Sequence, residues 1–278
     1  MSPCVINRLT PNGLQPAPYN ANSLADAVQY EPHDGVYTLA NTFNHGQVLK
    51  LDAHLDRLED SARRVNIPLK LDRLALRKAL SQMIQQSGYG DVRYRITVPH
   101  DTPDQIILSI EPFSGHPAEI YQNGVRAITL PNVARVNPVA KTTGWIHDRD
   151  NVPLPSGIFT GLLLDETGNI LEGTSSNFYA IMNGELRTAG AGVLPGIAQQ
   201  IIFEIAPALL PVKREAVNVS EIPQFTEAFI SGSSRVIVPV IEIDGIKIGD
   251  GQPGTLTRQL RTAYAVWMEA HLENLENS

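Results

Sequence analysis

The regular spacing of apolar residues breaks down between Pro112 and Pro117, where Gly115 lies between the two prolines. Proline removes a backbone donor and glycine has no side chain to pack, so such a stretch is typical of a connection between folded regions. A chain of 278 residues with 42% apolar residues can bury the cores of two modest domains. The sequence therefore predicts an α+β protein with a smaller N-terminal domain over residues 1–118 and a larger C-terminal domain over residues 119–278.

The N-terminal half alternates between strand and helix patterns. Aromatic and apolar residues on both sides of Asn44-His45-Gly46 predict a hairpin between Val36 and Leu49. An amphipathic helix follows, with Asp52 as its expected cap and one apolar stripe made of Leu51, Leu55, Leu58, Ala62 and Val65. The pattern then predicts a helix over residues 71–87, ended by Gly88, and strands over 92–98 and 105–110.

The C-terminal half is richer in strands. Short apolar runs bounded by turn residues predict strands over residues 125–130, 159–164, 178–181, 185–188 and 236–243. Helical spacing predicts helices over residues 197–209 and 256–272. Gly196 directly precedes the first of these helices, at the position where a helix opens.

Charge and cysteine content exclude several classes of function. The net charge of −7 provides no broad basic surface for a nucleic acid backbone. Cys4 is the only cysteine, which rules out an intramolecular disulfide and a cysteine-based metal site. The N-terminus has no apolar signal core, and no stretch approaches the roughly 18 apolar residues that span a bilayer. We therefore expect a cytoplasmic protein with no metal, no membrane contact and no nucleic acid partner.

Three segments far apart in the sequence are suited to hold one small anion. Arg57 on the first helix has a planar guanidinium that can bind a phosphate bidentately, the alternative being a surface arginine paired with Glu59 or Asp60. The helix start at Ile197 and Ala198 offers backbone N–H groups that lack intrahelical partners. The segment 231–234, Ser-Gly-Ser-Ser, offers hydroxyls and amides, the alternative being an ordinary turn.

Lys141 and Glu172 could serve a carbonyl cofactor that contains a basic ring nitrogen. Lys141 has small or apolar neighbours, and a desolvated lysine loses its proton more easily and can form an imine with an aldehyde. A carboxylate such as Glu172, placed close to a ring nitrogen, keeps that nitrogen protonated. The alternatives are a surface lysine and a charge at a strand end.

Taken together, these segments resemble the fold-type IV family of pyridoxal-phosphate enzymes, which contains D-amino-acid and branched-chain aminotransferases and aminodeoxychorismate lyase. The matching segments occur in the family's order and cover most of the chain: 34–37 (Asp-Gly-Val-Tyr), 54–58 (His-Leu-Asp-Arg-Leu), 141–143 (Lys-Thr-Thr), 172–178 (Glu-Gly-Thr-Ser-Ser-Asn-Phe), 194–197 (Leu-Pro-Gly-Ile) and 239–245 (Pro-Val-Ile-Glu-Ile-Asp-Gly). The resemblance implies a cofactor in the cleft between two domains, the C-terminal one being α/β-barrel-like and carrying Lys141 and Glu172.

The resemblance also implies a role for individual residues. Lys141 forms the Schiff base with pyridoxal 5'-phosphate and moves the Cα proton, and Glu172 contacts the pyridine nitrogen. The phosphate is held by Arg57, the amides of Ile197 and Ala198, and the hydroxyls of Ser233 and Ser234. Ser175 lies beside the cofactor, and Tyr37 lines the substrate pocket.

Three departures from the family pattern obscure the substrate. The Arg-x-His carboxylate trap of D-amino-acid aminotransferases is missing, since residues 99–101 read Pro-His-Asp. Arg93 and Arg95 alternate with Tyr94 and share one strand face, and we expect Arg95 to bind the α-carboxylate instead, the alternative being a sheet-edge charge. Ile146 replaces a cofactor-contacting tyrosine of branched-chain aminotransferases, and the helix after the lysine is expected to be interrupted because it runs into Pro153 and Pro155.

The leading hypothesis is a homodimeric aminotransferase that converts an amino acid and a 2-keto acid by a ping-pong cycle, with D-amino acids favoured because of Tyr37 and Ile146. Branched-chain L-amino acids or (R)-amines remain alternatives within the same reaction class. A different class, aminodeoxychorismate lyase, would release pyruvate without an amino acceptor. A non-catalytic protein that merely binds pyridoxal phosphate or a metabolite is the third hypothesis.

Overall fold

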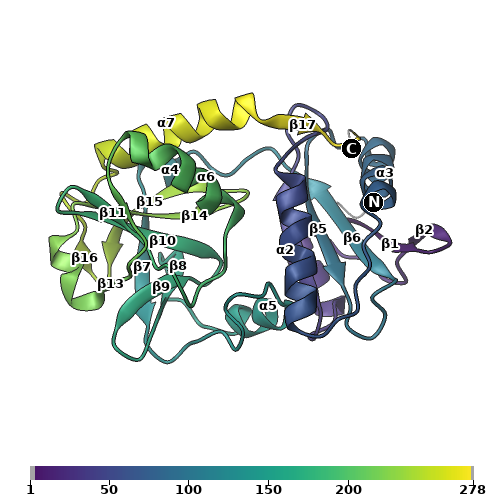
Figure 1. Ribbon diagram of the computed structural model, residues 1–278, viewed down its shortest axis with the longest axis horizontal. Coiled ribbons are helices and arrows are strands. Elements are labelled where there is room, and N and C mark those ends of the chain that lie inside the picture. Colours follow the sequence, from purple (N-terminus) through teal and green to yellow (C-terminus); the bar gives the residue numbers. More distant parts are fainter. Residues whose placement is uncertain (1–3, 277–278) are drawn as a thin grey trace. The chain divides into compact units, whose positions relative to one another are not determined.

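The computed structural model describes residues 4–276, which form two compact units (Figure 1). Unit 1 contains the residues up to Ser114, Ala140–Asn151 and the residues from His271 on, and unit 2 contains Gly115–Val139 and Val152–Ala270. This division differs from the expected boundary at residue 118, chiefly because the segment around Lys141 belongs to unit 1. Backbone hydrogen bonds explain the difference: Tyr37 N donates to Lys141 O at 2.9 Å, and Thr143 N donates to Gly35 O at 2.9 Å.

Unit 1 is built on an antiparallel five-stranded sheet in the order β2-β1-β6-β5-β3. Its strands are β1 (Val5–Thr10), β2 (Gly13–Pro16), β3 (Val36–Asn41), β5 (Val92–Val98) and β6 (Ile106–Pro112). Its helices are α1 (Leu24–Ala27), the 3-10 helix η1 (Val28–Tyr30), α2 (Leu51–Arg64), α3 (Arg73–Ser87) and α5 (Thr143–Asp150). A separate two-stranded ladder joins β4 (Gln47–Leu49) to β17 (Leu272–Asn274).

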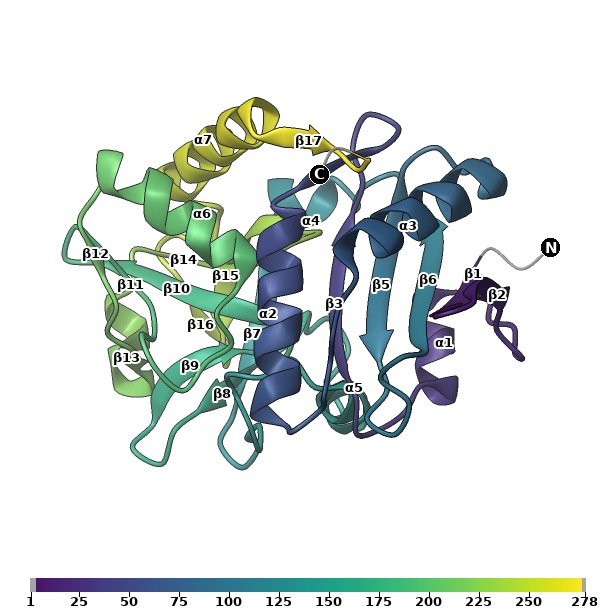
Figure 2. The same cartoon turned by 45° about the vertical axis from the view of Figure 1, so that its right-hand side comes forward.

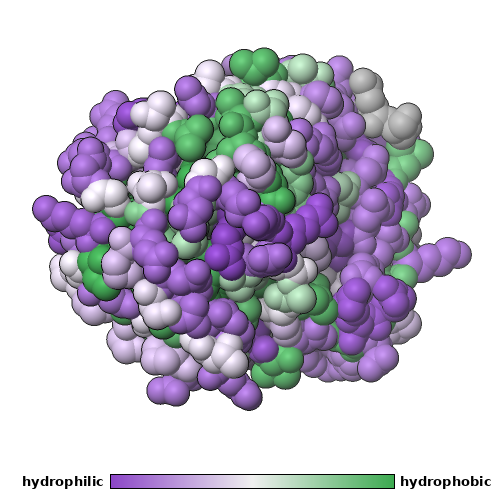
Figure 3. All heavy atoms as spheres, turned by 60° about the vertical axis from the view of Figure 1, so that its left-hand side comes forward, coloured by the Kyte–Doolittle hydropathy of each residue, from purple (hydrophilic) through white to green (hydrophobic). Residues whose placement is uncertain are grey.

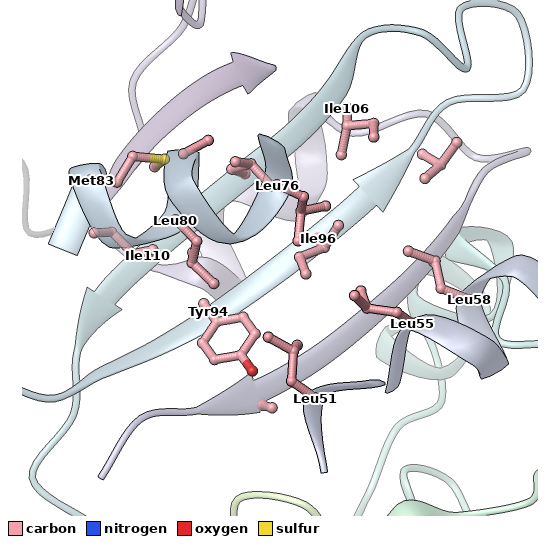
Figure 4. Packing of buried hydrophobic residues seen from close by; sticks show 14 of the residues in the cluster. Leu51, Leu55, Leu58, Leu76, Leu80, Met83, Tyr94, Ile96, Ile106 and Ile110 are labelled. Carbon is pink, nitrogen blue, oxygen red and sulfur yellow. The ribbon is translucent and has the colours of Figure 1, made fainter. Parts of the chain in front are cut away.

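The helices α2 and α3 cover one face of this sheet (Figure 2). Figure 4 shows the contact, in which apolar side chains of both helices pack against alternate residues of β5 and β6. The helices contribute Leu51, Leu55, Leu58, Leu76, Leu80 and Met83, and the strands contribute Tyr94, Ile96, Ile106 and Ile110. Strand side chains alternate between the two faces, so Ile107 packs instead with Leu24 and Ala27 of α1. Burial of each large apolar side chain contributes roughly 1.5–3 kcal/mol, which makes this the main stabilising contact of unit 1.

The sequence located the elements of unit 1 better than their pairing. The predicted stripe of α2 is buried except for Val65. The helix α3 ends at Gly88, as expected, and Gly88 has a left-handed conformation. Asp52 is not the cap of α2, because the helix begins at Leu51 and Lys50 occupies the cap position. The predicted hairpin is reduced to a single bridge between Phe43 and Gln47, since β3 pairs with β5 and β4 pairs with β17.

Unit 2 contains a mixed ten-stranded sheet that closes on itself. Nine strands follow the order β12-β11-β10-β14-β15-β7-β8-β9-β13, and the tenth, β16, pairs with β15. An additional β10–β9 pairing closes the ring through β14, β15, β7 and β8. The strands are β7 (Val125–Leu130), β8 (Thr160–Leu164), β9 (Asn169–Gly173), β10 (Ser176–Met182), β11 (Glu185–Arg187), β12 (Val212–Lys213), β13 (Val217–Asn218), β14 (Glu227–Gly232), β15 (Val236–Ile243) and β16 (Ile246–Lys247). The closed ring gives the barrel-like sheet that was expected.

Apolar residues fill the ring and helices cover its outside. Phe178, Met182, Ile230 and Val238 belong to the enclosed core. The helical segments are α4 (Glu119–Gln122), α6 (Ile197–Ile205), η2 (Ala206–Ala208), η3 (Val219–Gln224) and α7 (Thr255–Ala270). The helix expected over residues 197–209 is thus α6 followed by the 3-10 turn η2, which contains a proline.

Hydrophilic side chains predominate on the surface seen in Figure 3, with smaller apolar groups among them. Within residues 4–276, no helix combines the length and the apolar character that crossing a bilayer requires.

Candidate functional site

Lys141 is held in place by its own backbone. Its N–H donates to Ser61 Oγ on α2 at 3.0 Å, and its carbonyl accepts from Tyr37 N at the start of β3. The side-chain Nζ lies 4.5 Å from the centroid of the Tyr37 ring, within range of a cation–π contact. Lys141 and Tyr37, both singled out in the sequence, are therefore neighbours in unit 1.

Gly35 and Thr143 fix the two chain segments that carry Tyr37 and Lys141. Thr143 Oγ1 accepts from Gly35 N at 2.8 Å and donates to Gly35 O at 3.0 Å. A Cβ on Gly35 would lie 2.6 Å from the backbone oxygen of Val98, so a larger residue would push this segment away from β5. The Asp-Gly-Val-Tyr motif thus has a structural reason for its glycine.

The face of α2 next to Lys141 carries three polar residues at helical spacing: His54, Arg57 and Ser61. Arg57 is buried, and its Nη2 donates to Thr38 Oγ1 at 3.3 Å. The alternative, in which Arg57 lies at the surface and pairs with a neighbouring acid, is not what the structure shows, because Arg57 is buried and Asp60 pairs with Arg63 and Arg64.

His54, one turn before Arg57 on α2, is also fully buried. Its Nδ1 is 2.8 Å from Thr38 Oγ1. Burial, and then the positive charges of Arg57 and Lys141, hold the pKa of His54 well below its usual value. His54 is therefore neutral at physiological pH, a feature that the His-Leu-Asp-Arg motif did not reveal.

Arg95 has contacts that differ from those expected for it. Its Nε donates to Glu31 Oε1 at 2.9 Å and its Nη2 donates to Leu24 O at 2.7 Å, all in the buried interior of unit 1. Arg93 pairs with Glu111, whose carboxylate also accepts from Leu24 N. Both arginines therefore share one face of the sheet, as the alternation predicted, and this face lies against α1. The geometry favours a structural role for Arg95, which joins α1 and η1 to the sheet.

The segment after Lys141 forms a complete short helix. α5 runs for eight residues and ends at Asp150, before Pro153 and Pro155, so the prolines follow the helix and do not break its interior. Ile146 is buried against Val28 and Tyr37. Ile146, one of the departures from the family pattern, therefore contributes an apolar contact beside Tyr37.

In unit 2, Glu172 on β9 is buried and bonded through both oxygens. Oε1 accepts from Arg135 Nη1 at 3.0 Å, and Oε2 accepts from Leu194 N at 3.2 Å. Both side chains of the ion pair are less than a tenth exposed. A buried carboxylate keeps its charge only where a cation and hydrogen-bond donors compensate for lost water. Sequence reasoning missed Arg135, because it lies in an irregular segment with no motif around it.

Asn177 links the two expected anion-binding segments of unit 2. In the β10–β14 ladder it lies opposite Ser231, and its Nδ2 donates to Leu194 O at 2.9 Å. A Cβ on Gly196 would lie 2.0 Å from Asn177 Oδ1, so only glycine fits there. The start of β10 therefore lies between the Ser-Gly-Ser-Ser segment of residues 231–234, called here the serine turn, and the first residues of α6.

The donors around Asn177 suit an anion. Gly196 is the extended N-cap of α6 and makes no side-chain capping bond, so the amides of Ile197 and Ala198 open the helix. Ser234 Oγ is buried and has no hydrogen-bond partner within residues 4–276. Ser233 lies half-buried in the same turn, whereas Ser231 Oγ is bonded to Tyr179 OH at 3.0 Å.

Ser175 lies at the exposed end of the Glu-Gly-Thr-Ser segment. Its Oγ accepts from Arg235 Nη1 at 3.2 Å, and Arg235 directly follows the serine turn. The structure therefore gathers Glu172, Ser175, Asn177, the serine turn and the start of α6 in unit 2. It gathers Tyr37, Arg57 and Lys141 in unit 1.

Comparison with known proteins gives a consistent result. The family description "Amino-transferase class IV" matches residues 35–243. A protein of Methanocaldococcus jannaschii named as a branched-chain-amino-acid aminotransferase is 27% identical over 255 residues, 83% of this chain and 86% of its own. D-alanine aminotransferase of Bacillus licheniformis is 29% identical over 254 residues, 84% of this chain and 87% of its own.

Solved structures show the same fold. The branched-chain amino acid aminotransferase of Escherichia coli has a TM-score of 0.79 and 21% identity, with 98% of this chain and 99% of its own covered. Another solved branched-chain aminotransferase, which contains pyridoxamine 5'-phosphate, also has a TM-score of 0.79, with 19% identity and 98% of each chain covered. The expected fold type is therefore confirmed.

Proposed function

Because the chain belongs to the class IV aminotransferase family, a family of pyridoxal-phosphate enzymes, we propose that it transfers an amino group between a D-amino acid and a 2-keto acid. The observation that carries the proposal is the setting of Lys141, whose backbone is bonded to Tyr37 and Ser61 and whose amine lies against the Tyr37 ring. Tyr37 is the residue we assign to the substrate pocket.

The donor set fits the cofactor phosphate. Ser234 Oγ is buried with no partner in the described part of the chain, and the opening of α6 presents amide groups, which together suit a phosphate ester. We assign Arg57, Ile197, Ala198, Ser233 and Ser234 to that phosphate. Pyridoxal phosphate supplies an aldehyde that accepts the amino group and a ring that delocalises electrons.

The protein contributes proton handling and charge. We assign Lys141 Nζ to the substrate Cα, because an amine can accept a proton and return it. We assign Glu172 to the ring nitrogen, where a carboxylate held in the charged form by Arg135 would retain a proton on that nitrogen. Ser175 is assigned to the same cofactor.

Similarity supports two substrate classes. Identity to D-alanine aminotransferase and the presence of Tyr37 support D-amino acids. Identity to the Methanocaldococcus jannaschii protein supports branched-chain L-amino acids as the second candidate. We also propose that the protein is cytoplasmic and that it forms a homodimer. Light scattering of the purified protein would test the dimer.

The decisive experiment follows the cofactor absorbance of the loaded protein while D-alanine or L-leucine is added without a keto acid. We expect D-alanine to bleach the aldehyde band in wild type and Lys141→Ala to leave it unchanged. Lys70→Ala, which removes an exposed lysine of unit 1, is the matched control. Bleaching by L-leucine alone would favour the second candidate, and pyruvate release from aminodeoxychorismate without an acceptor would favour the lyase. Normal turnover by Lys141→Ala would overturn the assignment.

A further inference from the structure

Tyr179 on β10 has a fully buried phenol that connects two other parts of unit 2. Its OH lies 3.0 Å from Ser231 Oγ at the start of the serine turn, and the Gln199 side chain hydrogen-bonds the same phenol. Gln199 is the third residue of α6 and is buried as well. One phenol therefore joins the end of β14 to the first turn of α6.

The strand and its neighbour fix the orientation of the Tyr179 ring. Alternate strand residues share one face, so Tyr179 lies on the same face of β10 as Asn177, whereas Phe178 belongs to the enclosed core. The Tyr179 ring stacks on Phe229, its partner in the β10–β14 ladder, with centroids 4.5 Å apart and planes inclined by 12°. Strand pairing and stacking together hold the phenol in one direction.

The hydroxyl of Tyr179 stays protonated and serves both of its neighbours. Burial raises the pKa of Tyr179 well above its usual value, so the phenol keeps its hydrogen at physiological pH. A phenol can donate one hydrogen bond and accept another, and the Ser231 hydroxyl and the Gln199 amide can each take part in either way. Removing the phenol oxygen would leave two buried polar groups without this partner, which is costly.

The two segments that this phenol joins are the ones that we assign to the cofactor phosphate. The serine turn continues with Ser233 and Ser234, and α6 opens with Ile197 and Ala198 directly before Gln199. Hydrogen bonds to a phosphate are short and directional, so donors from two segments act together only where the separation of those segments is fixed.

Building on the proposed function, we infer that Tyr179 and Gln199 are positioning residues for the cofactor phosphate. They act through Ser231 and the first turn of α6, and they hold the hydroxyl donors and the amide donors at the separation that one phosphate needs. Donors that are already in place lose little freedom when the ligand binds, and this raises affinity.

The test compares Tyr179→Phe, Gln199→Leu and the double variant with wild type, using the full chain freed of cofactor. Pyridoxal phosphate and pyridoxal are titrated separately, because they share the ring and the aldehyde and only the first carries a phosphate. The ratio of the two Kd values therefore isolates the phosphate contribution, whereas a general loss of structure weakens both ligands alike.

Tyr94→Phe is the matched control. Tyr94 of unit 1 is also a fully buried phenol, and its OH has no hydrogen-bond partner within residues 4–276. Its removal should leave both Kd values within about twofold of wild type, since no hydrogen bond to the phosphate-binding segments is lost.

We expect each single variant to raise the Kd of pyridoxal phosphate by about 5- to 30-fold, the usual range for one lost hydrogen bond, and to leave the Kd of pyridoxal within about twofold. The double variant should lose about as much as the weaker-binding single variant, because both residues act through one set of bonds. Equal weakening of both ligands, unchanged binding of pyridoxal phosphate in either single variant, or losses that multiply in the double variant would each overturn the inference.

These titrations need no amino acid and no turnover, so they separate the inference from the proposed function. A selective loss of pyridoxal phosphate binding, in a protein that transfers no amino group, would support the positioning role and count against the transferase. A wild-type chain that binds pyridoxal phosphate no more tightly than pyridoxal would overturn the positioning role.

Discussion

His54 shows how one buried residue can be kept neutral between two cations. Arginine has only donors, so Thr38 Oγ1 accepts from Arg57, and the same hydroxyl lies 2.8 Å from His54 Nδ1. Thr38 therefore joins the Arg57 guanidinium to the neutral imidazole of His54.

The low pKa of His54 predicts a loss of stability in mild acid. The unfolded chain binds a proton at His54 near pH 6.5, whereas the folded protein binds it only at lower pH, so the unfolded state gains protons first as pH falls. The free energy of unfolding should therefore decrease below about pH 6.5, by up to about 1.4 kcal/mol per pH unit from this residue. Urea titrations at several pH values would measure it.

His54→Asn is the comparison variant, because its amide can replace Nδ1 in the bond to Thr38 but does not titrate. The variant should lose less stability than wild type between pH 7 and pH 5. Parallel pH profiles for the two proteins would contradict the prediction, since the carboxylates titrate equally in both.

At the scale of elements, α7 depends on a cap supplied by another element. Glu227 on β14 accepts from Leu256 N at 2.9 Å and from Thr257 N at 2.7 Å, and it also accepts from Thr257 Oγ1. A carboxylate at this end of a helix satisfies unpaired amides and complements the helix dipole. Gly254 belongs to the same arrangement, because a Cβ there would overlap the Glu227 side chain.

Glu227→Ala should lower the free energy of unfolding of unit 2 by about 1–3 kcal/mol, because it leaves these amides without their acceptor. Glu227→Gln, which keeps an acceptor oxygen but no charge, should lose less. Denaturant unfolding monitored by Trp267 on α7 would measure both variants. Equal loss in the two variants would show that packing of the side chain, and not its acceptor oxygens, supports α7.

Sequence patterns predicted elements where local chemistry decides them. The spacing of apolar residues found α2, and Gly88 marked the end of α3, because helix periodicity and a left-handed cap are local properties. Pairing between distant strands was not predictable in this way. The β17–β4 ladder joins residues 272–274 to 47–49, and no local signal identifies either partner.

The same distinction applies to the candidate site. Lys141 and Glu172 stand in recognisable motifs, but the acid that binds Arg95 and the arginine that binds Glu172 lie far away in sequence. Glu31 and Arg135 occur in segments without a helix or strand pattern of their own. Only the tertiary fold brings each of these residues to its partner. The sequence therefore did not show that Arg95 already has an acidic partner, and Arg95 was expected to bind substrate.

At the scale of the whole molecule, the residues assigned to the cofactor come from both units. Arg57 and Lys141 belong to unit 1, whereas Glu172, Ile197 and Ser234 belong to unit 2. A ligand that binds only the folded protein stabilises every part whose unfolding removes a contact to that ligand. Pyridoxal phosphate should therefore protect elements of both units from hydrogen exchange.

The expected stabilisation is about 2.7 kcal/mol at a free ligand concentration of about 100 times Kd. Hydrogen exchange of α2 in unit 1 and of β10 in unit 2, with and without pyridoxal phosphate, would resolve the two contributions. Protection of β10 alone would refute the assignment of Arg57 and Lys141, and protection of α2 alone would refute that of Glu172 and the serine turn. In Lys141→Ala, the bond between lysine and cofactor is lost while the phosphate donors remain, so protection should weaken in both units without disappearing.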